Sequence, residues 1–66
     1  MITQGATVRR NPAAYRHLSA DYLAEHGVVR KVYARLGMTL ALVRWRMIET
    51  EILVANLQLV ATERGR

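Results

Sequence analysis

The apolar residues in the second half of the chain recur at the spacing of a helix face. From Met38 to Glu63 the sequence contains neither Gly nor Pro. One set of apolar positions is spaced by three and four with Thr50 as its only interruption, and a second set follows about 140° further round the axis. The first set is Leu40, Val43, Met47, Val54, Leu57 and Ala61, and the second is Met38, Ala41, Trp45, Ile48, Ile52, Ala55 and Leu59. The pattern predicts a long helix with two apolar faces.

The first half of the chain predicts a shorter helix. Asn11-Pro12 is a typical helix start, because Asn accepts a bond from a free amide and Pro fits the first turn. This helix is expected to run from about 12 to 26, and Gly27 stands where a left-handed residue would end it. The long helix then covers about 28 to 63, either unbroken or broken at Gly37. Residues 1–10 lack periodicity and are expected to form a flexible basic arm before a single helical domain over 11–66.

Strands are an alternative for part of this region. Residues 43–47 and 48–52 each alternate between apolar and polar positions. No turn residue separates the two runs, however, and the alternation slips between Met47 and Ile48. Leu, Ala, Met, Glu and Gln, which favour helices, fill the rest. We therefore expect an all-α fold, a helical hairpin.

Two apolar faces on one helix require two neighbours, and a chain of 66 residues offers only one other helix. Small domains need further stabilisation, and this chain has no cysteine for disulfides. The sequence thus predicts a homo-oligomeric helix bundle, a dimer as first choice, with one face between copies and the second on a larger protein. The expected oligomer interface is Leu40, Val43, Met47, Val54 and Leu57, and the expected partner interface is Trp45, Ile48 and Ile52.

Positive charge is concentrated in the first two-thirds of the chain. Residues 1–47 hold eight basic and two acidic residues, a balance of +6, whereas residues 48–66 have a balance of −1. Such an excess predicts an anionic partner, either nucleic acid or an acidic protein surface. The expected contacts are Arg9, Arg10, Arg30, Lys31, Arg35, Arg44 and Arg46.

A weak helix-turn-helix pattern supports the nucleic-acid alternative. Leu36, Gly37 and Met38 match an apolar residue, a turn glycine and a second apolar residue, and Val43 and Met47 would lock the second helix. Tyr33 stands against this pattern, since a small residue is normally needed where the two helices cross. The alternative function is thus a dimeric helix-turn-helix-like regulator that binds nucleic acid.

Catalysis has little support in the sequence. His17, Ser19 and Asp21 resemble triad residues, but on a helix residues two apart point about 200° from each other. His17 and His26 lack the spacing of a metal site, and no glycine-rich phosphate loop is present. We expect no catalytic residues, no metal and no cofactor.

The remaining expectations concern location. The charged residues among 44–51 would be costly within a bilayer, which argues against a membrane-spanning helix, and residues 1–6 do not resemble a secretion signal, so a cytoplasmic protein is expected. An interfacial membrane helix is a third alternative. The leading function is a small, basic, non-catalytic helical protein that self-associates and docks on a larger partner, as an accessory subunit, assembly factor or modulator.

Overall fold

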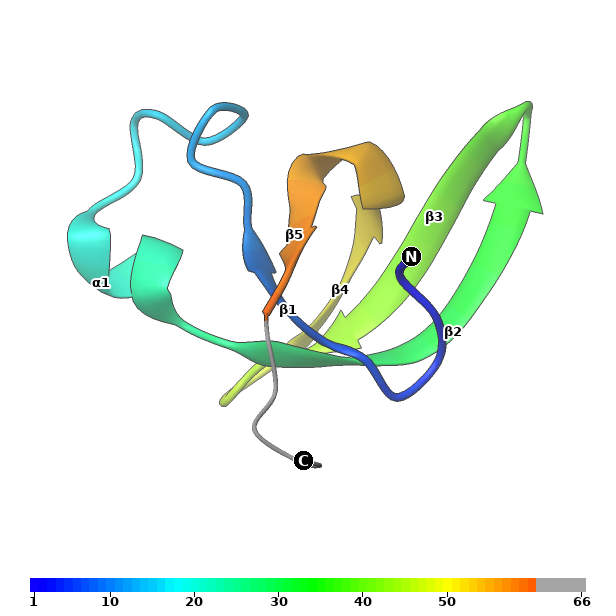
Figure 1. Cartoon of the computed structure of the whole chain (residues 1–66), viewed down its shortest axis with the longest axis horizontal. Coiled ribbons are helices and arrows are strands. Elements are labelled where there is room, and N and C mark those ends of the chain that lie inside the picture. Colours follow the sequence, from blue (N-terminus) through cyan, green and yellow to red (C-terminus); the bar gives the residue numbers. More distant parts are fainter. Residues whose placement is uncertain (61–66) are drawn as a thin grey trace.

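The computed structural model describes residues 1–60 and shows a bent antiparallel sheet of five strands (Figure 1). The strands are β1 (Thr7–Arg10), β2 (Gly27–Arg35), β3 (Met38–Arg44), β4 (Glu49–Leu53) and β5 (Leu57–Leu59). Their order across the sheet is β4-β3-β2-β1-β5, and every neighbouring pair is antiparallel. A short helix, α1 (Ala20–Ala24), precedes β2, and one 3₁₀ turn, η1 (Val54–Asn56), joins β4 to β5.

The predicted all-α fold is therefore wrong. Neither the helical hairpin over about 12–26 and 28–63, nor the helix bundle, nor the helix-turn-helix is present, because three strands occupy most of residues 27–53. Of the first predicted helix only Ala20–Ala24 is helical, and residues 7–10 of the predicted arm form β1. Ala61 and Glu63, which belonged to the second predicted helix, lie outside the described residues.

The core lies on the inner face of the bent sheet, and every strand contributes to it. Its buried members are Val8, Val29, Ala41, Val43, Trp45, Ile52 and Leu57. Val8, Val29 and Val43 are at most 1% exposed, so the centre of the sheet is tightly covered. The core combines residues from strands far apart in the sequence. It is therefore buried only when all five strands have assembled into the sheet.

The interior strand β3, which lies between β4 and β2, is apolar on both faces, and this explains the helical appearance of its sequence. Ala41 and Val43 point into the core, so Leu40 and Leu42 lie on the other face. There Leu40 stands opposite Tyr33 of β2 and Leu53 of β4, and it is only 5% exposed. A strand covered on both sides reads as a continuous apolar run instead of an alternation.

A bulge in β2 conceals the alternation of that strand as well. Val29 pairs with Val43 and Lys31 pairs with Leu42, so Arg30 is an extra residue without an opposite partner. Side chains that point into the core therefore fall on odd-numbered residues up to Val29 and on even-numbered residues after it. The run from Val28 to Arg35 matches neither a simple strand nor the predicted helix start.

Gly37, which was expected either to lie within the long helix or to break it, lies in the turn between β2 and β3. Leu36 and Gly37 form a two-residue loop with φ angles of 54° and 77°. Two positive φ angles are typical of the type I′ turns that join antiparallel strands. Gly27 does not end a helix in the left-handed conformation; it begins β2 in the core.

Asn11 stabilises a turn instead of a helix. Its side-chain Oδ1 accepts a hydrogen bond from the Ala13 amide at 3.0 Å, and its carbonyl accepts bonds from Ala14 and Tyr15. Residues 11–19 continue as turns until α1 begins. Within residues 1–60 no helix has the length and apolar character that crossing a membrane requires.

Candidate functional site

An open groove lies between the α1 region and the end of β3. One wall comes from residues 21–28, and the other comes from residues 44–47 at the turn into β4. A smaller hollow adjoins it, lined by Arg10, Tyr22, Glu25, Trp45, Met47 and Ile48. Two segments about twenty residues apart in the sequence thus form one concave surface.

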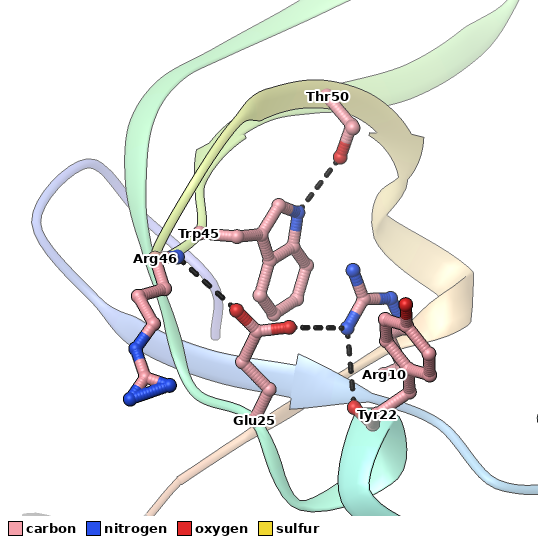
Figure 2. A network of polar contacts seen from close by, with 6 residues as sticks. All are labelled: Arg10, Tyr22, Glu25, Trp45, Arg46 and Thr50. Atoms are coloured by element: carbon pink, nitrogen blue, oxygen red, sulfur yellow. Dashed lines mark hydrogen bonds and ion pairs between the residues drawn. The ribbon is translucent and has the colours of Figure 1, made fainter. Parts of the chain in front are cut away.

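Trp45 forms the base of this surface. Its side chain is 2% exposed, and its indole Nε1 donates a hydrogen bond to Thr50 Oγ1 at 2.7 Å. The guanidinium of Arg10 lies 3.9 Å from the centroid of the indole ring (Figure 2). A guanidinium at this distance is attracted to the aromatic face, and the attraction is stronger where water is excluded. Trp45 is thereby fixed and covered.

Glu25 connects the two walls. Its Oε1 accepts a bond from Arg10 Nη1 at 3.3 Å, and its Oε2 accepts one from the backbone amide of Arg46 at 3.1 Å (Figure 2). Arg10 also donates to the carbonyl oxygen of Tyr22 at 3.1 Å. One carboxylate therefore holds the α1 region, β1 and the turn between β3 and β4 together.

Large side chains remain exposed around the groove. Tyr22 is 57% exposed, Met47 82% and Ile48 56%, and Arg44 and Arg46 are exposed as well. Tyr, Met and Arg are residue types enriched in protein interfaces, and Arg and Tyr are frequent among the residues that contribute most binding energy. The surface combines these types on a support that Trp45 and Glu25 hold in place.

The ion pairs leave the groove with unpaired positive charge. Within residues 1–60 three of the four carboxylate side chains pair with arginines, as Arg10–Glu25, Arg30–Glu49 and Arg35–Glu51. Arg44 and Arg46 have no ion pair within that part of the chain. Asp21 lines the opposite wall. The wall from residues 44–47 therefore presents two positive charges to a ligand in the groove.

The predicted oligomer interface is divided between core and surface. Val43, Leu40 and Leu57 are at most 6% exposed within a single chain, whereas Met47 is exposed and Val54 is half-buried. Of the predicted partner interface, Trp45 and Ile52 are buried and Ile48 is exposed. The helix faces that grouped these residues do not exist, although contact of either set with another chain stays a prediction.

The predicted anion contacts do not lie together. Arg44 and Arg46 line the groove, and Arg10 lies beneath its surface. Arg9 donates to Gln58 Oε1 at 3.0 Å on the opposite side of β1 from Arg10. The remaining three, Arg30, Lys31 and Arg35, are exposed on β2. The structure thus brings only part of the set together.

Sequence reasoning did not identify Tyr22, Glu25 or His26 as site residues. They line the groove because the chain between β1 and β2 returns to the end of β3. No local pattern marks this return. The available signal was a local reversal of charge, because residues 17–29 contain Asp21 and Glu25 but no Lys or Arg, whereas the rest of residues 1–47 is basic.

Outside the groove, Tyr33 and Glu51 form a hydrogen bond on the outer face of the sheet, where Arg35 also donates to Glu51. The Tyr33 hydroxyl, with Arg35, lowers the pKa of the exposed Glu51 carboxyl below its ordinary value. The same hydrogen bond raises the pKa of Tyr33. Within residues 1–60 no group of three or more His, Cys, Asp or Glu side chains is placed to hold a metal ion.

Searches of protein-family models, curated proteins and solved structures found no match to this chain.

Proposed function

We propose that this protein is a non-catalytic binding module whose groove holds an extended segment of a larger protein. The segment presents an apolar side chain to Tyr22 and Met47 and acidic side chains to Arg44 and Arg46. The observation that carries the proposal is the exposure of these large side chains beside two arginines that form no ion pair within residues 1–60. Positive charge on one wall would steer acidic segments toward the groove.

The geometry favours a protein segment over nucleic acid. Single strands bind to exposed aromatic side chains on which bases stack. Trp45 is 2% exposed and its ring face is occupied by Arg10, so only the Tyr22 ring and the smaller imidazole of His26 are exposed for stacking among the residues lining the groove. Arg10, Arg30 and Arg35 are already bound to carboxylates. A nucleic-acid backbone would therefore find no continuous row of free cations for its phosphates.

The test is a selection of peptides from a random display library on the immobilised protein. We expect enriched peptides to carry Asp or Glu next to Leu, Ile, Phe or Trp. Binding to Arg44→Glu/Arg46→Glu should be weaker by about tenfold or more, as expected for lost charge pairs at an interface. The matched control is Arg16→Glu/Lys31→Glu, which reverses two exposed charges outside the groove lining.

Three results would overturn the proposal. One is that no peptide is enriched, and another is that both charge-reversal variants lose binding equally. The third is tight binding of a single-stranded oligonucleotide with a steep salt dependence, which would indicate a phosphate-binding surface instead.

Two further features belong to the same proposal. A cytoplasmic location fits a module that meets other proteins there, and fractionation of the native host would test it. Self-association as a dimer is a separate proposal, measured by sedimentation at several protein concentrations.

A further inference from the structure

We infer that the partner segment leaving the groove continues along β4 and adds to the sheet as a sixth strand. This inference rests on the proposed function, because it concerns the same bound segment. It adds a backbone contact to the side-chain contacts of the groove. Strand addition of this kind supplies affinity through main-chain hydrogen bonds.

β4 is an edge strand over its whole length. It occupies one end of the strand order and pairs with β3 alone, through an unbroken register from Arg44↔Glu49 to Leu40↔Leu53. Within residues 1–60 the backbone hydrogen bonds made outside the sheet ladders include none from residues 49–53. Five residues of extended chain, about 17 Å, are thus open on one side.

The turn before β4 shows which backbone groups face outward. The Trp45 amide donates to the Ile48 carbonyl at 2.7 Å, which makes this the first hydrogen-bonded pair of the hairpin. Bonded and non-bonded pairs alternate along an antiparallel ladder. Thr50 and Ile52 therefore bond to β3, whereas Glu49, Glu51 and Leu53 direct their amides and carbonyls to the open edge.

The acidic side chains of β4 do not guard this edge. Edge strands are commonly protected by charge. Glu49 Oε2, however, lies 2.7 Å from Arg30 Nη1, and Glu51 Oε1 lies 2.8 Å from Arg35 Nη2. Both arginines belong to β2, on the far side of β3, so the carboxylates reach away from the edge and are neutralised. An acidic segment therefore meets little repulsion there.

The groove leads directly to this edge. Ile48 lines the hollow beside Met47 and immediately precedes β4. A segment held by Arg46 and Met47 that extends past Ile48 arrives beside Glu49. Continuity between the two surfaces commits the occupant to an extended segment of a partner protein.

The experiment measures amide hydrogen exchange by NMR in the full chain, with and without a peptide enriched in the selection described above. We expect the Glu49, Glu51 and Leu53 amides to exchange about tenfold more slowly when the peptide binds, because each gains a partner. The Thr50 and Ile52 amides, already bonded to β3, serve as internal controls and should change little.

The outcomes separate the two proposals. Chemical-shift changes confined to residues 21–28 and 44–48, with unchanged exchange in β4, would overturn strand addition and leave the groove as the binding site. Failure to obtain any binding peptide would overturn both.

A pair of variants tests the backbone contact independently. Glu51→Ala removes the carboxylate but keeps the amide, whereas Glu51→Pro also removes the outward donor, which edge strands tolerate. We expect Glu51→Pro to bind the peptide about fivefold to tenfold more weakly than Glu51→Ala, as one lost hydrogen bond predicts. Equal affinities would overturn the inference. Should Glu51→Pro fail to fold, N-methylation along the peptide replaces it, with losses expected at every second residue.

Discussion

The two ends of β3 are held by different means. At its start, the turn of Leu36 and Gly37 depends on the local backbone, with both residues at positive φ, and Leu36 is 88% exposed. At its end, the turn into β4 also makes tertiary contacts, since Glu25 binds the Arg46 amide from 21 residues away and Trp45 is buried in the core. The end that makes these tertiary contacts is also the one that carries the groove.

Replacing Trp45 by Ala should have the largest effect on the tertiary end. The change removes a side chain that is 2% exposed together with its bond to Thr50, so we expect a loss of about 3–5 kcal/mol in the free energy of unfolding. A domain of this size has little more to lose, so the variant should be largely unfolded in circular dichroism. Ile48→Ala, which truncates an exposed neighbour, is the control. A folded Trp45→Ala protein would contradict the role given to this residue.

Adding one methyl group at Gly27 tests how closely the two segments approach. A Cβ there would lie 2.6 Å from Val43 Cγ1 and 2.7 Å from Trp45 Cε3, both in the core. Overpacking of this kind costs about 1–3 kcal/mol, so Gly27→Ala should lower the midpoint of urea unfolding accordingly. An unchanged midpoint would mean that β2 and Trp45 are further apart than described. Ala24→Ser, at an exposed position of α1, controls for the substitution itself.

Glu25 should matter less, because it is partly exposed to solvent. Glu25→Ala removes the acceptor of both the Arg10 and the Arg46 bonds, and we expect a loss of about 1 kcal/mol after allowing for screening by water. The Arg46 amide should also exchange faster with solvent. Asp21→Ala, on the same wall, should change neither quantity, and an equal effect of both variants would show that general charge is responsible.

The same difference explains what the sequence predicted and what it missed. Residues 43–47 and 48–52 each alternate as strands do, but no turn residue separates them and the alternation slips between Met47 and Ile48, so the sequence favours a helix. The chain nevertheless turns there: the Trp45 amide donates to the Ile48 carbonyl across the turn, and Glu25 Oε2 accepts a hydrogen bond from the Arg46 amide. The contact that comes from 21 residues away leaves no signature in the local sequence. Gly37, at a turn made by local backbone alone, was the residue at which a break was considered.

The sequence indicated some of the residue types of the candidate site but not their arrangement. The excess of arginines and the importance of Trp45 are visible in the sequence, whereas the burial of Trp45 under Arg10 is not. The pairing of Arg30 and Arg35 with β4 also depends on strand order. Because the bulge at Arg30 and the two-sided cover of β3 mimic helical spacing, pattern alone favoured the wrong fold.

At the local end of β3, a better turn residue should stabilise the protein. Leu is disfavoured at positive φ, whereas Asn-Gly is preferred in type I′ turns, and Leu36 contributes little to the core because it is 88% exposed. Leu36→Asn should therefore raise the free energy of unfolding by about 0.5–1 kcal/mol. Leu36→Ala keeps the strained backbone and should change stability little. Destabilisation by Asn would show that the exposed leucine is packed in the folded protein.

The smallest effect concerns pH and the outer face between the two ends. The pKa of the Glu51 carboxyl is lowered by the Tyr33 hydroxyl, so its contribution to stability is present above about pH 4.5 and is lost as the pH falls through the lower folded value. The raised pKa of Tyr33 acts in the opposite range, since its contribution is present below pH 10 and is lost as the pH rises through the higher folded value.

Glu51→Gln should therefore flatten the pH dependence of urea unfolding at both extremes. Glu49→Gln, whose carboxylate bonds to Arg30 and not to Tyr33, should leave the alkaline part unchanged. Because Glu51 and Tyr33 do not line the groove, Glu51→Gln should leave its shape unchanged, and altered exchange of the Arg46 amide in this variant would contradict the separation of the two regions.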